Sequence, residues 1–72
     1  MNKIKNKFSI RLKELREAKG ISQQQLANKL GYTQVCISRW ESSNRQPNLD
    51  DVIIVAMFFN VTTDYLLGLT DF

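Results

Sequence analysis

The chain has 72 residues, of which 43% are hydrophobic and 24% are charged. This length allows one small domain over residues 1–72, and the composition is that of a folded globular protein rather than of a disordered one. The longest apolar run, residues 52–59, is too short to span a membrane, and one cysteine cannot form an internal disulfide, so we expect a cytoplasmic protein without a membrane partner.

Charge is distributed unevenly along the chain, although the net charge is only +3. Residues 1–47 hold all ten Lys and Arg against three Glu, a local charge of +7, and residues 48–72 hold four Asp and no basic residue, a local charge of −4. The basic part suits a phosphate backbone, and the acidic part would face away from it. The sequence has no histidine and no acidic or thiol cluster for a metal, so we expect neither an enzyme nor a cofactor.

The first predicted helix follows a short basic arm. Residues 1–7, the arm, either contact a DNA backbone or stay a solvated end of the chain. From Phe8 onwards apolar residues recur at helical spacing, and Lys19 and Gly20 end this pattern. The predicted apolar stripe comprises Phe8, Leu12, Leu15 and Ala18, and the predicted polar side comprises Arg11, Lys13, Glu14, Arg16 and Glu17.

Two short helices joined by a tight turn are predicted for residues 22–41. Ser22 and Gln25 can form a capping box that starts one helix at Gln23, and a left-handed Gly31 would close it. Thr33 is the expected N-cap of the next helix, which runs to about Glu41. The apolar residues expected to pack this pair are Leu26, Ala27 and Leu30 on the first helix, and Ile37 and Trp40 on the second.

The helix that ends near Glu41 has different inner and outer sides. We interpret Cys36 as a packed thiol rather than a redox sensor, and Trp40 as a core residue rather than a platform for base stacking. The opposite side must face solvent, and its short polar and basic side chains suit the edges of base pairs in a major groove. The candidate base-reading residues are Gln34, Val35, Ser38 and Arg39.

Two further helices are predicted after a polar loop at residues 42–47. They span residues 49–59 and 63–67, with N-caps at Asn48 and Thr62, C-terminal residues Asn60 and Gly68, and a short tail at residues 69–72. The longer of these helices is apolar nearly all round. Its predicted core face is Leu49, Val52, Ala56 and Phe59, which leaves Ile54, Met57 and Phe58 on the opposite side. These three form a candidate dimer surface, together with Leu66, Leu69 and Phe72, unless the tail covers them or the exposure is harmless.

Residues 22–41, SQQQLANKLGYTQVCISRWE, resemble the helix-turn-helix of the Cro and CI repressor family. Several spaced positions agree with the family pattern S-Q-x-x-L-A-x-x-x-G followed by I-S-x-[WY]-E, and the resemblance extends from about Phe8 to Gly68. It implies an all-α fold, a compact five-helix domain like that of the lambda repressor. The second and third helices of this domain would form the helix-turn-helix.

The resemblance also implies roles for single residues. In the family, the residues at the positions of Gln34, Val35 and Arg39 read bases, and the glutamine at the position of Gln23 holds a phosphate. Polar residues around the turn and the following loop add candidate backbone contacts: Thr33, Lys29, Asn44, Arg45 and, with a weaker basis, Lys19.

An ion pair is the second implication of the resemblance. In the family, an arginine of the first helix and a glutamate at the end of the third form a partly buried pair, and the corresponding residues here are Arg16 and Glu41. The alternative is that the two are unrelated surface charges.

These observations favour one function and leave a second open. The favoured function is sequence-specific binding of double-stranded DNA by a small transcriptional regulator, a repressor that binds an inverted repeat as a homodimer. The alternative is a protein-binding module, such as an antitoxin that neutralises a partner protein, with DNA binding secondary.

Overall fold

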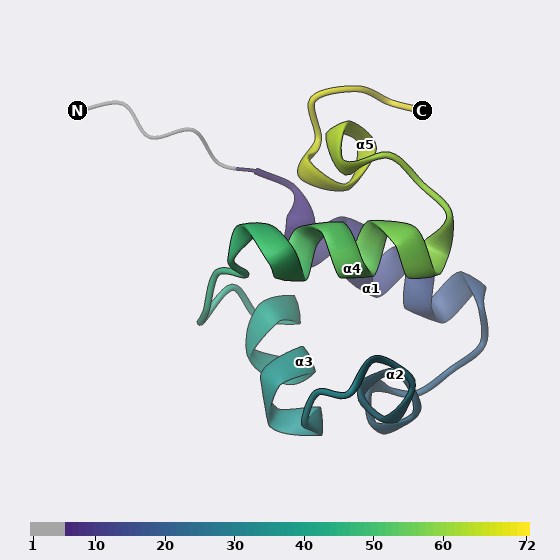
Figure 1. Cartoon of the computed structure of the whole chain (residues 1–72), viewed down its shortest axis with the longest axis vertical. Helices are drawn as coiled ribbons and strands as arrows, with labels where there is room; N and C mark the ends of the chain where they lie inside the picture. The colour runs from purple at the N-terminus through teal and green to yellow at the C-terminus, as the bar shows by residue number, and fades with distance from the viewer. Residues whose placement is uncertain (1–5) are drawn as a thin grey trace.

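The sequence signals for helix ends act locally, and they place the five helices of residues 6–72, the part of the chain described in the computed structural model (Figure 1). The helices are α1 (Phe8–Ala18), α2 (Gln23–Leu30), α3 (Gln34–Glu41), α4 (Leu49–Phe59) and α5 (Thr63–Leu67). The predicted all-α fold is confirmed. The predicted basic arm lies mostly outside the described residues, which include only Asn6 and Lys7 of it.

Side-chain caps start four of the helices at the predicted positions. Ser22 Oγ accepts from the backbone N–H of Gln25 at 3.0 Å, and the Gln25 side chain accepts from the backbone N–H of Ser22 at 2.8 Å. Asn48 and Asp51 make the same reciprocal box at the start of α4, and Thr33 and Thr62 cap α3 and α5. Each cap satisfies backbone donors that the first turn of a helix leaves free, so the boundaries follow from single polar residues.

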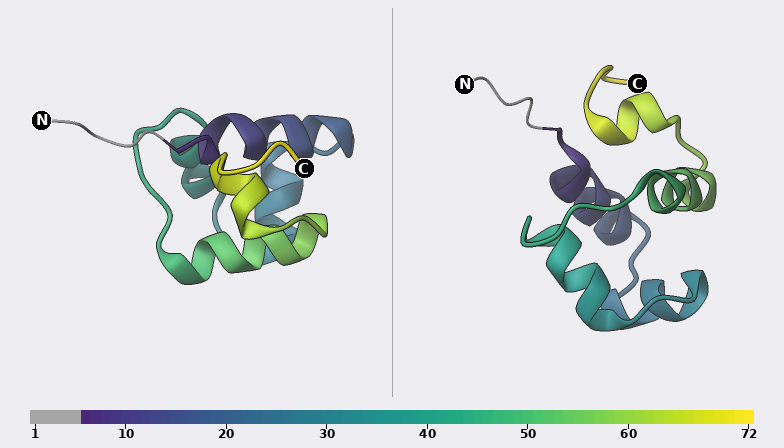
Figure 2. Two further views of the ribbon diagram at one scale, coloured as in Figure 1. Left: turned by 90° about the horizontal axis from the view of Figure 1, so that it is seen from above. Right: turned by 60° about the vertical axis from the view of Figure 1, so that its left-hand side comes forward.

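The helices pack as two groups around one core. α2 and α3 contact each other and lie at one end of the molecule, and α3 also contacts α1 (Figure 1). α5 lies at the other end and packs against both α1 and α4, as the two views of Figure 2 show. α4 also contacts α2 and thereby links the two groups. The outer side of α3 stays uncovered.

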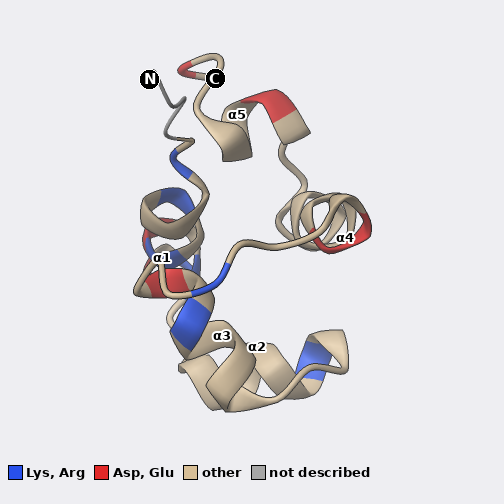
Figure 3. Ribbon diagram, turned by 90° about the vertical axis from the view of Figure 1, so that its left-hand side faces the viewer, with Lys and Arg blue, Asp and Glu red and all other residues tan. Residues whose placement is uncertain are grey.

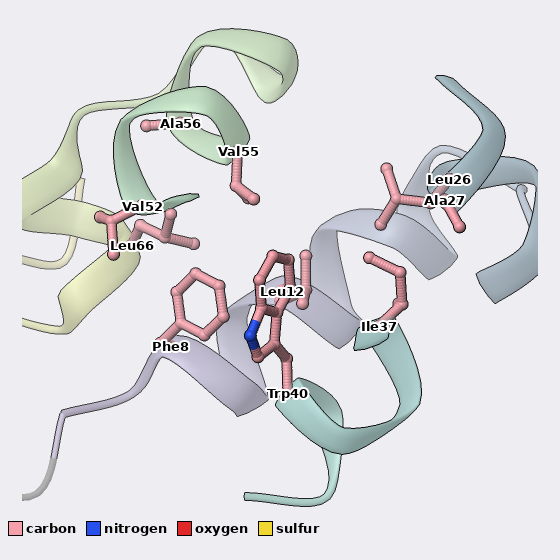
Figure 4. Close-up of a cluster of buried hydrophobic side chains, with 10 residues drawn as sticks. All are labelled: Phe8, Leu12, Leu26, Ala27, Ile37, Trp40, Val52, Val55, Ala56 and Leu66. Atoms are coloured by element: carbon pink, nitrogen blue, oxygen red, sulfur yellow. The ribbon is translucent and has the colours of Figure 1, made fainter. Parts of the chain in front are cut away.

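Trp40 lies at the centre of the core (Figure 4). Its ring meets that of Phe8 at a centroid distance of 5.6 Å and that of Tyr32 at 4.9 Å, both edge to face. The prediction that Trp40 is a core residue is confirmed, since it is 1% exposed. The buried hydrophobic residues are Phe8, Leu12, Leu26, Ala27, Ile37, Trp40, Val52, Val55, Ala56 and Leu66.

The predicted core face of α4 is wrong in two positions. Leu49 is 83% exposed, because it occupies the first turn of the helix, ahead of the part that crosses the core. Val55 is fully buried instead, so the core face is centred on Val52, Val55 and Ala56, with Phe59 packed beside it. A helix that is apolar nearly all round gives no strong amphipathic signal, and tertiary packing decides which side turns inward.

The polar side predicted for the first helix also needs correction. Arg11 is only 8% exposed, and its Nη1 donates to the backbone carbonyls of Tyr65 at 2.7 Å and Thr70 at 3.0 Å. The guanidinium carbon lies 4.1 Å from the centroid of the Tyr65 ring. Arg11 thus binds the C-terminal end of α5 and the chain that follows it. At the other end of α1, Ala18 is exposed rather than part of the apolar stripe.

Candidate nucleic-acid interface

α3 turns one side into the core and the other side to solvent. Ile37 and Trp40 anchor it, being 0% and 1% exposed. On the outer side Val35 is 53% exposed, Arg39 is exposed, and Gln34 and Ser38 are half-buried. The four candidate base-reading residues therefore occupy one accessible surface of α3.

A chain of hydrogen bonds links Gln34 through Gln23 to Glu41, at the end of α3. Gln34 Nε2 donates to Gln23 Oε1 at 2.7 Å, and Gln23 Nε2 donates to Glu41 Oε1 at 3.0 Å. A carboxylate can only accept, so Gln23 must turn its NH₂ group to Glu41 and its oxygen to Gln34. Within residues 6–72, this order leaves Gln34 with a free Oε1 and one free N–H. The link between the two glutamines is not readable from the sequence, because it depends on how α2 and α3 cross.

Arg16 and Glu41 make the expected ion pair. Arg16 Nε and Nη2 donate to the two Glu41 oxygens at 2.7 Å and 3.0 Å, and Nη1 donates to the Ile21 carbonyl at 2.9 Å. The side chains are 12% and 4% exposed. The hydrogen bond to Glu41 raises the pKa of Arg16, and burial opposes this shift. With Gln23 as a third donor, Glu41 joins α1, α2 and α3 at one carboxylate.

The candidate backbone contacts surround this surface. Gln23 occupies the first position of α2, and the Thr33 hydroxyl caps α3 by accepting from the Cys36 N–H at 3.1 Å, which leaves its own O–H to donate elsewhere. Lys29, Asn44 and Arg45 are exposed, on the last turn of α2 and in the loop after α3. The loop folds back onto α3, since the backbone N–H groups of Asn44 and Arg45 both donate to the Arg39 carbonyl.

A polar hollow of about 320 Å³ lies where α1, α2 and α3 meet. Its lining is Lys13, Arg16, Gln23, Ser38, Glu41 and Ser42. Lys13 is a candidate contact that was not predicted from the sequence. The available signal was its position, since Lys13 lies three residues before Arg16 and hence on the same side of α1.

Cys36 and Lys19 lie away from this surface. Cys36 is half-buried against the core, and burial raises the pKa of its thiol, as fits a packed side chain. The Lys19 ammonium lies 5.5 Å from the centroid of the Phe58 ring. Among residues 6–72 no group of acidic, cysteine or histidine side chains could hold a metal, and none of the helices there is long and apolar enough to cross a membrane.

The predicted dimer surface on α4 is only partly exposed. Ile54 is 40% and Met57 75% exposed, but Phe58 is half-buried and packs against the core and the neighbouring Phe59. Leu66, which was expected to extend this surface, is fully buried, whereas Leu69 and Phe72 are 70% and 92% exposed. Leu66 is therefore a core residue, and Phe58 packs beside the core without being fully buried.

The fold and this surface define a helix-turn-helix domain, in which α2 supports α3 and α3 presents an accessible polar side. A sequence profile of the helix-turn-helix family matches residues 12–66, and the chain belongs to this family, among its regulators of the Cro/CI type. The family consists of DNA-binding domains of transcription regulators and is not an enzyme family.

Three similar proteins illustrate this membership. YobD of Bacillus subtilis (strain 168), an uncharacterized HTH-type transcriptional regulator, is 39% identical over 61 residues, covering 85% of this chain and 54% of YobD. The HTH-type transcriptional activator BcrR of Enterococcus faecalis is 39% identical over 61 residues, covering 85% of this chain and 30% of BcrR. The chain thus spans about half or less of these relatives.

The third is a solved structure, that of the P22 c2 repressor protein in complex with a synthetic operator. It superposes with a TM-score of 0.77 at 30% identity, covering 83% of this chain and 91% of that one.

Proposed function

We propose that this chain binds double-stranded DNA sequence-specifically and represses transcription, as a homodimer on an inverted repeat in the cytoplasm. The observation that carries the proposal is the outer side of α3, where Gln34, Val35, Ser38 and Arg39 stay accessible while Ile37 and Trp40 anchor the helix. The similarity to the P22 c2 repressor, solved in complex with a synthetic operator, supports the same interpretation.

The chemistry of the four side chains suits base edges. The free Oε1 and N–H of Gln34 match the N6 donor and N7 acceptor of adenine, in the orientation that Gln23 and Glu41 impose. Arg39 can donate twice to guanine, and the methyl groups of Val35 can contact a thymine methyl group. Ser38 can donate to or accept from a neighbouring base.

Backbone contacts would fix the register of α3 in the groove. Gln23 lies at the positive end of the α2 dipole, where free backbone N–H groups favour a phosphate. Thr33, Lys29, Asn44 and Arg45 supply further donors, and we add Lys13, which lines the hollow beside Gln23. These contacts provide affinity and orientation but no sequence preference.

The homodimer and the inverted repeat follow from what one small module can do. A single recognition helix contacts few base pairs, and two copies on half-sites about one helical turn apart multiply the specificity. Repression would follow from occupying a promoter. Since one relative, BcrR, carries the name of an activator, a reporter gene must measure the direction of regulation.

Selection of bound sequences from random duplex DNA tests the proposal directly. We expect an enriched inverted repeat and an affinity that falls steeply as salt rises, because bound cations are released from the phosphates. Absence of binding to any duplex even at low salt would overturn it.

The second candidate function, a protein-binding module such as an antitoxin, rests on the exposed apolar residues of α4. Met57 and Ile54 are 75% and 40% exposed, which suits a protein partner. Under this alternative the chain would bind a partner through α4 and show only secondary DNA binding. A lack of sequence enrichment in the selection experiment would favour it over the first candidate.

A further inference from the structure

An open apolar groove of about 420 Å³ lies between the first half of α4 and α5. Its lining includes Leu49, Val52 and Ile53 of α4, Thr63 and Leu67 of α5, and Pro47 of the preceding loop. Leu49 is 83% and Ile53 47% exposed at its edge. This groove is separate from the exposed part of the earlier candidate surface at Ile54 and Met57.

We infer that the occupant of this groove is a second copy of the chain, with the exposed leucine of each copy inserted in the groove of the other. This inference rests on the proposed function, because it names the surface through which the homodimer forms. A dimer with two-fold symmetry needs one surface that is complementary to itself. A protruding Leu49 beside a hollow of this size meets that condition, since each copy supplies both the inserted side chain and the hollow.

The charges around the groove support the same partner. Figure 3 shows basic positions in the segment before α1 and in the loop after α3, beside mixed basic and acidic positions on α1 and α3, and acidic positions in α4 and α5 across from them. The exposed residues concerned are Lys7 and Arg45 on the basic side and Asp50 and Asp64 on the acidic side.

These four exposed charges favour one direction of the two-fold axis. An axis that runs vertically in Figure 3, within the plane of this face, turns the basic side of one copy onto the acidic side of the other. The same axis keeps the α2–α3 units of both copies at one end, where a single DNA duplex can reach them. An axis across the figure would pair like charges and place the two units at opposite ends.

A dimer held by contacts at this groove alone would be weak. Eight residues line it, whereas standard interfaces involve about 20 to 30 residues on each side. An interface of standard size would bury about a sixth of the 5070 Å² accessible surface of one copy. The two copies therefore pair mainly when adjacent half-sites raise their effective concentration.

Substitution of Leu49 tests the inference. Leu49→Gln keeps the net charge and replaces an exposed apolar side chain by a polar one. In a symmetric dimer this single substitution alters the interface twice, once in each copy. We expect about a tenfold or larger loss of affinity for duplexes with two selected half-sites and an unchanged affinity for one half-site. Met57→Gln, at a similarly exposed position of the same helix but outside the groove, separates this groove from the earlier candidate surface and, under this inference, should change neither affinity.

Self-association without DNA provides the second measurement. Sedimentation equilibrium and dilution-dependent amide shifts of the full chain should show a weak dimer, with the shifts confined to residues 46–53 and 63–67, and Leu49→Gln should abolish both. The inference fails if Leu49→Gln pairs like the unchanged chain, or if Met57→Gln alone prevents pairing. If Leu49→Gln loses pairing but still binds one half-site, the substitution affects this interface alone. If the unchanged chain pairs but binds no DNA, the proposed function is refuted instead.

Discussion

Arg11 is the residue whose role departs most from its sequence position. Its place in the sequence predicts one of several surface charges on α1. In the structure it is buried and donates to two backbone carbonyls more than fifty residues further along the chain. Its ion pair with Asp71 is longer, 3.6 Å, and the Asp71 side chain is 94% exposed. The carbonyls and the Tyr65 ring, rather than the opposite charge, should therefore account for its contribution to stability.

Arg11→Met should lower the free energy of unfolding by about 2–4 kcal/mol, because two partly buried carbonyls lose a charged donor. Asp71→Asn should lower it by less than about 0.5 kcal/mol, as expected for an exposed pair. Urea unfolding followed by Trp40 fluorescence measures both changes. Equal effects of the two substitutions would show that the ion pair, and not the carbonyl contacts, is what matters.

Arg39 tests base reading at a single residue. Arg39→Ala should relax the preference at one base pair of each half-site and cost about 1–3 kcal/mol on the preferred sequence. The fold should be unaffected, since the Arg39 side chain is exposed. Competition binding with each base pair varied in turn measures the preference. A uniform loss on all sequences would instead identify Arg39 as a backbone contact.

At the scale of the elements, helix boundaries were predictable because caps and left-handed residues act over three or four positions. Ser22, Thr33, Asn48 and Thr62 start their helices where the sequence predicts, and Gly31 ends α2 with a φ of 81°. What the sequence did not reveal depends on contacts between distant elements. Serine has no strong left-handed preference, so the φ of 64° at Ser43, where the loop leaves α3, had no local signal.

The same distinction applies to the site. The outer side of α3 was predictable because Ile37 and Trp40 mark the inner side. The burial of Val55 and the partial burial of Phe58 were not, because α4 offers apolar residues in every direction and the packing of α2 and α5 on α4 selects among them. The glutamine link between Gln23 and Gln34 likewise follows from the crossing of α2 and α3.

One hydrogen bond joins the turn between α2 and α3 to α4. Tyr32 Oη donates to Asp51 Oδ1 at 2.7 Å, while Asp51 Oδ2 accepts from the Asn48 N–H that starts α4. Tyr32→Phe keeps the ring against Trp40 and should lower the free energy of unfolding by about 1–2 kcal/mol. Unfolding in urea at neutral pH measures this. No change would show that water replaces the bond without cost.

The pH dependence of this contact has a definite sign. Burial, and next the hydrogen bond to Asp51, raise the pKa of Tyr32 above its ordinary value. The folded state therefore holds this proton more tightly than the unfolded state. Its contribution is complete below the ordinary tyrosine pKa of about 10 and is lost as the pH rises towards the folded value. Unfolding curves of Tyr32→Phe should lack this part of the alkaline loss.

For the whole molecule, the uneven distribution of basic and acidic residues should decide how the salt concentration changes the affinity for DNA. All Lys and Arg lie in residues 1–47 and all Asp in residues 48–72, where Asp50 and Asp51 belong to α4, Asp64 to α5 and Asp71 to the tail. Only phosphates that a basic side chain contacts release counterions. The position of a charged residue should therefore change the salt dependence of the affinity more than the net charge does.

Two single substitutions separate position from net charge. Arg45→Ala should weaken binding to all sequences alike and reduce the slope of log affinity against log salt by about 1 for each bound copy. Asp71→Asn makes the net charge more positive by one but should leave the slope unchanged, since Asp71 lies on the tail beyond α5. Salt titrations on one half-site measure both slopes. If Asp71→Asn steepened the slope as much as Arg45→Ala reduced it, net charge rather than the contacts around α3 would govern binding.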